Sequence, residues 1–370
     1  MKILIFSLAY HPFVGGAEVA IKEITDRLGG DFEFDLITAN LDGRQKSEEQ
    51  IGRVKVHRLC YVASYVTKYL FPWLAFKKAA ELQAQNHYDA VWAMMANQAG
   101  WAALKFKKKF PAVKYLLSLQ EGDSEWDIWR RTFFIRPIYK AIYRRADYIQ
   151  AISNFLAKRA KKLGARCPIE VVPNGIQVES QKSKVESIGD KKIITVSRLV
   201  KKNGISDLIK AMTAVEGELL ILGDGKLRKI LERLTERLGI KNKVKSLGYL
   251  SQDEVYKYLS QADVFVRSSL SEGLGNSFLE AMAMRVPVIG TPVGGIPDFL
   301  KDGETGWFCQ VKNPKSISGK INYILDGKNK AEVARIVAAA NAMVMEKYNW
   351  ALVTSKMKNI FQILISKNNL

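Results

Sequence analysis

The sequence predicts an α/β protein with two similar halves, each built on a doubly wound, mostly parallel sheet. The chain has 370 residues, which suits two domains of ordinary size. Short apolar runs alternate with amphipathic, helix-like runs, a pattern typical of parallel sheets with helices on both faces. A polar, charged stretch at 179–192 interrupts this alternation and predicts a linker between two domains.

The first half is predicted to span residues 1–178. It opens with a buried strand over 2–8, followed by a glycine-rich turn and a helix over 17–28. Further apolar runs predict strands at 32–38, 54–59, 90–94, 113–119, 148–152 and 169–172.

The second half is predicted to span residues 193–351 and repeats the alternation. Its strands are expected at 193–196, 219–222, 244–247, 264–266 and 286–289. An amphipathic helix that begins at Trp350 ends the chain.

Composition excludes several classes of protein. Hydrophobic residues make up 48% of the chain and charged residues 25%, which excludes a disordered chain. The 3 cysteines and 3 histidines are spread widely, so neither a disulfide scaffold nor a metal site is predicted. The opening apolar run lacks a cleavage site, and no run reaches the ~20 residues of a membrane span. A cytoplasmic protein is therefore expected.

The charge of the chain points to an acidic partner. Lys and Arg number 57 against 37 Asp and Glu, a net charge of +20. Residues 105–166 alone carry 16 basic and 5 acidic side chains. Phosphate groups, nucleic acid or an anionic membrane surface would each match such an excess.

Basic and aromatic side chains interleave around 68–78 and over 126–145. This pattern predicts reversible docking on an anionic membrane surface, on its inner face for a cytoplasmic protein. The alternative is a solvated basic helix whose aromatic side chains pack into the core.

Three motifs follow predicted strands. Gly15 and Gly16 precede the first helix, where a free backbone and a helix N-terminus suit an anion, although a plain tight turn is the alternative. Arg198 and Lys202 follow the first strand of the second half, where they suit a phosphate or form a solvated basic loop.

The third motif, at 271–283, is the most informative. Its glycines free the backbone, and the amides of residues 276–278 would cradle a phosphate at a helix start. Ser277 and Glu280 have the spacing of a capping box, which is the structural alternative. A capping box leaves Glu272 unexplained, and two carboxylates beside a glycine-rich turn suit hydroxyl recognition. Gly223 and Gly294 each follow a further predicted strand, where an ordinary turn is the simplest interpretation.

Together these motifs resemble glycosyltransferase family 4, the retaining group 1 glycosyltransferases of GT-B fold. The resemblance covers most of the chain and rests on an ordered set: GGAE at 15–18, VPNGI at 172–176, SRLVKKNG at 197–204, GDGKL at 223–227, LGYLS at 247–251 and EGLGNSFLEAMA at 272–283. It implies two Rossmann-like domains facing a cleft, with a final helix over about 352–370 crossing back onto the first.

The resemblance also implies roles for single residues. Arg198 would contact the diphosphate of a nucleotide sugar, Glu280 the ribose and Glu272 the transferred sugar. The implied donor-binding set is Gly15, Gly16, Arg198, Lys202, Asn203, Gly223, Gly248, Tyr249, Glu272, Gly273, Leu274, Gly275, Asn276, Ser277 and Glu280. Neither a metal nor a resident cofactor is implied.

Two departures from the family pattern affect the catalytic set, which is Glu272, Arg198, Lys202 and Gln120. Asn203 stands where the family usually has its phosphate lysine, and Lys202 precedes it. Gln120 stands where many members have a histidine, and an amide cannot shuttle a proton near neutral pH.

The expected function is a retaining transfer of sugar from a nucleotide-sugar donor, with UDP favoured over GDP, to a glycan or lipid-linked acceptor in cell-surface polysaccharide or glycolipid assembly. One alternative is a nucleotide-sugar epimerase of the same fold. The other is a basic nucleic-acid-binding protein. The nucleic-acid-binding alternative is disfavoured because the sequence contains no nucleic-acid-binding motif and because the Glu272 and Glu280 carboxylates would repel phosphates.

Overall fold

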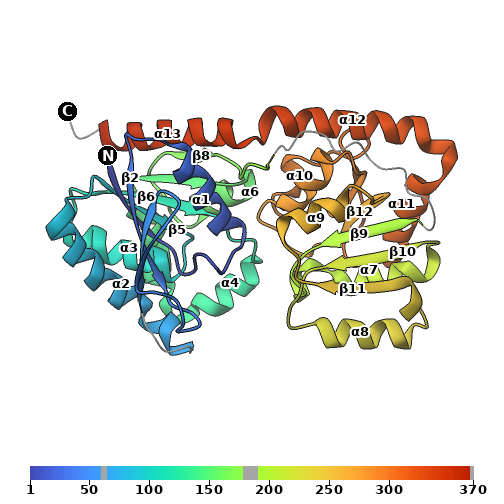
Figure 1. Ribbon diagram of the computed structural model, residues 1–370, viewed down its shortest axis with the longest axis horizontal. Helices are drawn as coiled ribbons and strands as arrows, with labels where there is room; N and C mark the ends of the chain where they lie inside the picture. Colours follow the sequence, from blue (N-terminus) through green and yellow to red (C-terminus); the bar gives the residue numbers. More distant parts are fainter. Residues whose placement is uncertain (60–64, 178–190, 367–370) are drawn as a thin grey trace. The chain divides into compact units, whose positions relative to one another are not determined.

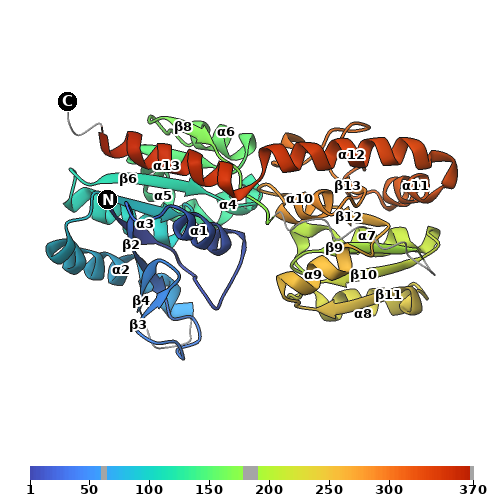
Figure 2. The same ribbon diagram turned by 45° about the horizontal axis from the view of Figure 1, so that its top comes forward.

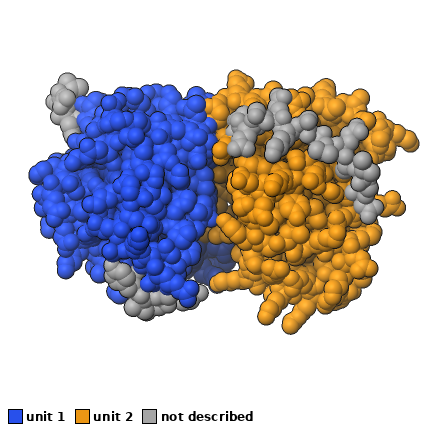
Figure 3. Space-filling model, viewed as in Figure 1, with its two compact units in different colours: residues 1–121, 125–175, 350–370 blue, residues 122–124, 176–349 orange. Residues whose placement is uncertain are grey.

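The computed structural model describes residues 1–59, 65–177 and 191–366 (Figure 1). The chain forms two compact units, coloured separately in Figure 3. Unit 1 comprises residues 1–121, 125–175 and 350–370, and unit 2 comprises 122–124 and 176–349. Most of the predicted linker at 179–192 lies outside the described residues.

Unit 1 is built on an eight-stranded sheet with the order β3-β4-β2-β1-β5-β6-β7-β8. The strands are β1 (Lys2–Phe6), β2 (Glu33–Ala39), β3 (Glu48–Ile51), β4 (Val54–Leu59), β5 (Ala90–Met94), β6 (Lys114–Leu119), β7 (Tyr148–Ala151) and β8 (Ile169–Val171). Every pairing is parallel except β3 with β4. Strand β3 was not predicted, because its sequence EEQI has no apolar run and it forms an edge hairpin.

Helices flank this sheet. They are α1 (Gly16–Arg27), α2 (Tyr65–Asn86), α3 (Gln98–Lys109), α4 (Glu125–Thr132), α5 (Arg136–Arg144), α6 (Asn154–Lys162) and α13 (Trp350–Ser366), with a 3-10 turn η1 (Phe133–Ile135) between α4 and α5. The terminal helix α13 lies beside α1 in both ribbon views (Figures 1 and 2). Its Val353, Met357 and Phe361 enter the hydrophobic core of unit 1, so the end of the chain belongs to the first unit, as predicted.

Unit 2 is built on a six-stranded, wholly parallel sheet with the order β11-β10-β9-β12-β13-β14. Its strands are β9 (Lys192–Val196), β10 (Glu218–Leu222), β11 (Val244–Gly248), β12 (Val264–Arg267), β13 (Val288–Gly290) and β14 (Trp307–Phe308). Its helices are α7 (Ile205–Ala211), α8 (Arg228–Arg237), α9 (Gln252–Leu259), α10 (Asn276–Ala283), α11 (Pro314–Leu325) and α12 (Lys330–Lys347).

The two-sheet α/β architecture is confirmed, with small corrections. The strand expected at 286–289 begins at Val288, because the amide of Val286 still donates to the carbonyl of Ala281 at the end of α10. The two-residue strand β14 was not predicted, since so short a run has no periodicity.

Each sheet has a point where its strand order reverses. In unit 2 the chain leaves β9 toward β10 and β11, and later adds β12, β13 and β14 on the other side. In unit 1 the same reversal separates β1 from β5. Open α/β sheets bind ligands beyond the carboxyl ends of their strands at such points. The ends of β9 and β12 are therefore the first place to look for a site.

Candidate functional site

The carboxyl edge of the unit 2 sheet collects most of the predicted site residues. Arg198 follows β9, and Glu272 follows β12, so these two flank the reversal point. Gly223 follows β10 and donates its amide to the carbonyl of Gly248 at 2.7 Å, which ties the ends of β10 and β11 together. The next residue, Tyr249, is 76% exposed and leaves an aromatic face open at this edge.

Arg267, the last residue of β12, holds the centre of the site together. Its Nη2 lies 2.5 Å from Oε2 of Glu272 and 3.3 Å from Oδ1 of Asn203. Its Nη1 donates to Oγ of Ser277 at 2.9 Å. One guanidinium thus joins three predicted site residues, two from the motif at 271–283 and one from the motif at 197–204. Sequence reasoning missed Arg267, and its signal was a charged residue that closes an otherwise apolar strand.

Asn203 is a structural tie in this chain. It is 1% exposed, and its Nδ2 donates to the carbonyl oxygen of Arg198 at 2.6 Å. A buried amide whose oxygen and nitrogen are both hydrogen-bonded fixes the loop that carries Arg198, whereas a lysine ammonium at this position would be buried. The Arg198 guanidinium itself is exposed and, within the described ranges, makes no ion pair or hydrogen bond.

Lys202 lies in the 3-10 turn η2 (Lys201–Asn203) and pairs with Asp123, with Nζ 2.9 Å from Oδ1. Residues 122–124 belong to unit 2, where Oγ of Ser271 donates to the carbonyl of Gly122 at 3.0 Å. Asp123 therefore holds the ammonium of Lys202 beside the loop that contains Glu272.

The loop around Glu272 is tightly packed. Oε1 of Glu272 accepts a hydrogen bond from the amide of Gly273 at 3.0 Å, and its carbonyl accepts one from Gly295 at 3.2 Å. Gly294 has a φ of +59°, and a Cβ there would lie 1.8 Å from the carbonyl oxygen of Glu272. Only glycine lets these two backbone segments approach so closely.

The capping box of Ser277 and Glu280, the structural alternative for this motif, does not form. Helix α10 begins at Asn276, and its N-cap is Gly275 with a φ of +99°, a conformation that favours glycine. Ser277 bonds to Arg267, and Oε1 of Glu280 accepts from Nε2 of Gln252 on α9 at 3.0 Å. No side chain caps the first turn of α10. The amide of Phe278 donates to the carbonyl of Gly275 at 3.0 Å, so of the three amides predicted to cradle a phosphate only those of Asn276 and Ser277 are left for an anion.

Two further residues of this segment have well-defined surroundings. Glu280 is half-buried, and burial raises the pKa of its carboxyl above the ordinary value. Leu274 is 1% exposed, so its side chain packs inside and leaves only its backbone for a ligand.

The three candidates of unit 1 lie at the carboxyl edge of its sheet. Gly15 is the N-cap of α1, and its amide donates to Oε2 of Glu18 at 2.8 Å. Gly16 is the first residue of that helix. Gln120 follows β6 and exchanges two amide hydrogen bonds with Asn174, at 3.1 and 3.0 Å. Glu121 beside it is half-buried, and desolvation raises the pKa of its carboxyl.

Among the residues that the structure describes, no group of three or more His, Cys, Asp and Glu side chains could hold a metal ion. In those same residues no helix is both long and apolar enough to cross a membrane.

Two family models match the chain. The model described as Glycosyltransferase Family 4 matches residues 14–180, and the one described as Glycosyl transferases group 1 matches residues 177–341. The chain is 28% identical over 389 residues to an uncharacterized glycosyltransferase of Methanocaldococcus jannaschii, covering 98% of both chains.

A second relative has a more specific name. It is the GDP-mannose-dependent monoacylated alpha-(1-6)-phosphatidylinositol monomannoside mannosyltransferase of Corynebacterium glutamicum, 28% identical over 312 residues, which covers 76% of this chain and 78% of that protein. Among solved structures, Anabaena HepE in complex with UDP and glucose has a TM-score of 0.80 at 19% identity. That match covers 98% of this chain and 100% of HepE, and it shows the GT-B fold.

Proposed function

Because this chain belongs to the group 1 glycosyltransferases, we propose that it transfers a sugar from a UDP-sugar to a glycan or lipid-linked acceptor in cell-surface polysaccharide or glycolipid assembly. In this reaction the anomeric carbon exchanges its bond to the diphosphate for a bond to an acceptor hydroxyl oxygen. The proposed transfer retains the anomeric configuration and uses no metal, as the family resemblance implies.

The network around Arg267 is the observation that carries this proposal. It fixes Glu272, Asn203 and Ser277 beside the reversal point of the unit 2 sheet, where α/β sheets bind nucleotides. Through Asn203 it also sets the loop that presents the exposed Arg198. A rigid frame with one exposed guanidinium suits a doubly charged diphosphate, because the frame is ordered before the ligand arrives.

Each contact in the proposed donor complex has a physical reason. Arg198, Lys202 and the amides of Asn276 and Ser277 at the start of α10 would stabilise the charge that develops on the departing diphosphate. Glu280, with Gln252 beside it, would accept hydrogen bonds from the ribose hydroxyls. Glu272 would orient hydroxyls of the transferred sugar. The roles that the family resemblance implies for Gly15, Gly16 and Gln120 stay predictions.

UDP remains the proposed nucleotide. HepE was solved with UDP, which supports this choice, whereas the Corynebacterium relative is named for GDP-mannose. The exposed Tyr249, at the predicted base end of the site, offers a stacking face that either base would accept.

Thermal unfolding with UDP, GDP and ADP, each with EDTA present, tests the donor site. A ligand at a hundred times its dissociation constant adds about 2.7 kcal/mol of stability. We expect stabilisation by UDP that is lost in Arg198→Ala and Glu280→Ala. No stabilisation by any nucleotide would contradict the proposal, and proton NMR of the product anomer would test retention.

We also propose reversible docking on the anionic inner face of a membrane. On α2, Tyr69 and Trp73 are 72% and 47% exposed, and Lys105 of α3 lies 5.4 Å from the Trp73 ring centroid. Phe133 and Phe134 of η1 are 54% and 94% exposed. Exposed aromatic side chains next to lysines suit the headgroup region of a cytoplasmic leaflet, which carries anionic lipids.

The aromatic side chains of the 126–145 segment divide between the two alternatives. Tyr139 and Tyr143 are buried and share a hydrogen bond between their hydroxyls at 2.9 Å, so they belong to the core. Trp126, Phe133 and Phe134 are exposed, and they are the side chains on which docking would depend.

A further inference from the structure

Unit 1 contains an open pocket between helices α4, α5 and α6, which we call the α4–α6 pocket. Its volume is 420 Å³, within the ~300–1,000 Å³ usual for small-molecule sites. The residues that define its chemistry are Trp126, Trp129, Arg136, Lys140, Arg159 and Lys162. None of them has a role in the donor site of unit 2.

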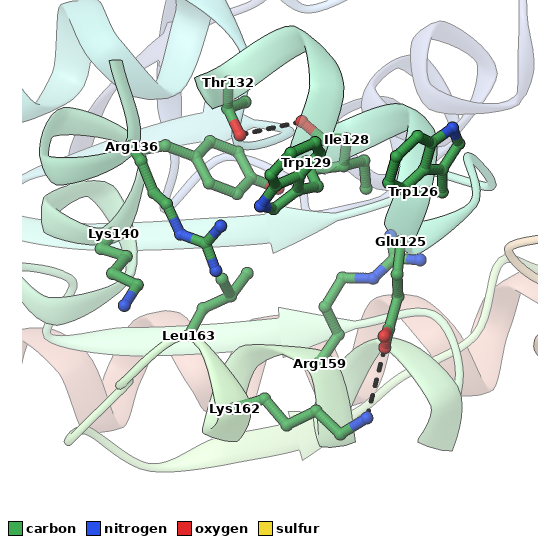
Figure 4. A pocket seen from close by; sticks show the side chains of 11 residues that line it. Glu125, Trp126, Ile128, Trp129, Thr132, Arg136, Lys140, Arg159, Lys162 and Leu163 are labelled. Carbon is green, nitrogen blue, oxygen red and sulfur yellow. Dashed lines mark hydrogen bonds and ion pairs between the residues drawn. The ribbon is translucent and has the colours of Figure 1, made fainter. Parts of the chain in front are cut away.

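One wall of the pocket is aromatic. Trp126 and Trp129 lie on the same face of α4, three residues apart, with ring centroids 5.1 Å apart and an interplanar angle of 17°. They are 66% and 38% exposed. Figure 4 shows both indoles at the pocket, with Trp129 near its centre. A stacked, solvent-exposed indole pair offers a flat apolar surface, which the C–H face of a sugar ring can cover.

Four of the other side chains that line the pocket are cationic. In Figure 4, Arg136 and Lys140 lie to the left of Trp129, and Arg159 and Lys162 lie below it. The only carboxylate that lines the pocket in the described structure is Glu125, whose Oε1 is 3.3 Å from Nζ of Lys162. Four cations thus face one anion.

Arg159 and Arg136 differ in what they can do. Arg159 is 4% exposed, and its guanidinium lies 4.6 Å from the Phe155 ring and bonds to the carbonyl of Glu121. It is a fixed positive charge in the wall of the pocket. Arg136 and Lys140 make no ion pair or hydrogen bond with any residue that the structure describes, so their donors are available to a ligand.

We propose that the α4–α6 pocket binds a phosphorylated sugar or polyol, with the ring on the Trp129 indole and the phosphate on Arg136 and Lys140. A guanidinium binds two phosphate oxygens at once, and the nearby ammonium adds a point charge. This inference rests on the proposed function and deepens it, because it makes the acceptor a phosphate-bearing glycan unit. The phosphate is either free in solution or part of a lipid headgroup.

Binding of glucose 1-phosphate, measured by indole fluorescence and calorimetry, tests the pocket, with glucose and inorganic phosphate as comparisons. Vesicles of phosphatidylcholine with and without phosphatidylinositol phosphate form the second arm. The test variant is Arg136→Ala/Lys140→Ala. The matched control is Lys161→Ala/Arg166→Ala, which removes the same charges from exposed positions outside the pocket.

We expect glucose 1-phosphate to bind more tightly than glucose or phosphate, and the test variant to bind at least about tenfold more weakly than the control. Binding of the soluble ligand identifies a free phosphosugar. Binding of phosphoinositide vesicles alone, lost in the test variant only, identifies a headgroup. Equal loss in test and control variants, or no binding of either probe, overturns the proposal.

UDP stabilisation is measured on the same samples. Because UDP is assigned to unit 2, a normal UDP shift without pocket binding overturns only this inference. Pocket binding without a UDP shift contradicts only the proposed donor site.

Discussion

Arg267 and Glu272 form a buried ion pair at the end of β12, with Nη2 2.5 Å from Oε2 and both side chains nearly covered, at 11% and 12% exposure. The same guanidinium also bonds to Ser277 and Asn203. Removal of one partner from a buried pair leaves the other charge uncompensated, which is far more damaging than removal of both.

Arg267→Leu is expected to lower the free energy of unfolding by about 3–5 kcal/mol. In Arg267→Leu/Glu272→Leu most of this stability should return, because no unpaired carboxylate remains, while UDP-sugar turnover stays lost. Thermal and urea unfolding measure the first effect, with the exposed Arg237→Ala as control. If Arg267→Leu were as stable as the control, the pair would not hold the site together.

Arg198→Ala is expected to weaken UDP binding about 10- to 100-fold, because a charge-assisted hydrogen bond contributes about 1.5–3 kcal/mol. Its stability without ligand should change by no more than about 0.5 kcal/mol, since the guanidinium is exposed. Calorimetric titration measures the affinity. Lys201→Ala, the matched change at an exposed neighbour, should bind UDP normally, and an equal loss there would point to a general charge effect.

Glu280 predicts a pH dependence of donor binding. Burial raises the pKa of its carboxyl, so the carboxylate is lost at a higher pH than in an exposed glutamate. As the pH falls, the carboxyl loses its negative charge and accepts hydrogen bonds from the ribose hydroxyls more weakly, so UDP affinity should decrease. Protonation removes a buried charge, so this carboxyl's contribution to stability rises over the same range.

UDP titrations between pH 7.5 and pH 5 measure the effect, with Glu280→Gln as the comparison. The variant should bind more weakly at pH 7.5 and show a flatter pH dependence. Parallel profiles in the two proteins would assign the titration to another group.

His57 joins two carboxylates in unit 1, with Nε2 2.8 Å from Asp35 and Nδ1 2.9 Å from Glu48. Burial alone would raise the pKa of Asp35, but hydrogen bonds from His57 and Tyr88 outweigh it and leave that pKa lowered. The hydrogen bond from His57 likewise lowers the pKa of Glu48. Lowered carboxyl pKa values stabilise the fold above about pH 4, and this stability is lost as the pH falls through the folded-state values.

His57→Leu should therefore destabilise the protein by about 2 kcal/mol at pH 7, and the difference from wild type should narrow below about pH 4. Urea unfolding at pH 7 and at about pH 3 measures both values. A difference that stays constant across this range would mean that packing, and not the carboxylates, accounts for the loss.

Docking predicts that Phe133→Ser/Phe134→Ser lowers affinity for vesicles with 30% phosphatidylglycerol by about tenfold, because two exposed rings no longer enter the interface. Co-sedimentation measures the bound fraction. The control is Ile230→Ser, which removes a 59% exposed apolar side chain from unit 2. Binding that is indifferent to anionic lipid, or that falls equally in the control, would remove the docking proposal.

Local pattern was sufficient for most of the fold. The strands at 54–59 and 90–94 and the helix from Trp350 were predicted where they occur, because buried parallel strands and amphipathic helices have periods that one segment displays alone. The edge strand β3 was not predicted, since its stability comes from pairing with β4 and not from its own apolar content.

The sequence by itself determined the α/β class, the two halves, the family and the loops that carry Arg198 and Glu272, because each depends on contiguous motifs. Only the tertiary structure decided which of those residues contact one another. It made Arg267 the centre of the site, turned Asn203 into a tie for the Arg198 loop, and directed Ser277 and Glu280 away from a capping box. Hydrogen bonds and ion pairs act over about 3 Å. Only the folded chain brings atoms this close when their residues are 10, 28 or 64 positions apart, as in the bonds from Arg267 to Ser277, from Gln252 to Glu280 and from Arg267 to Asn203.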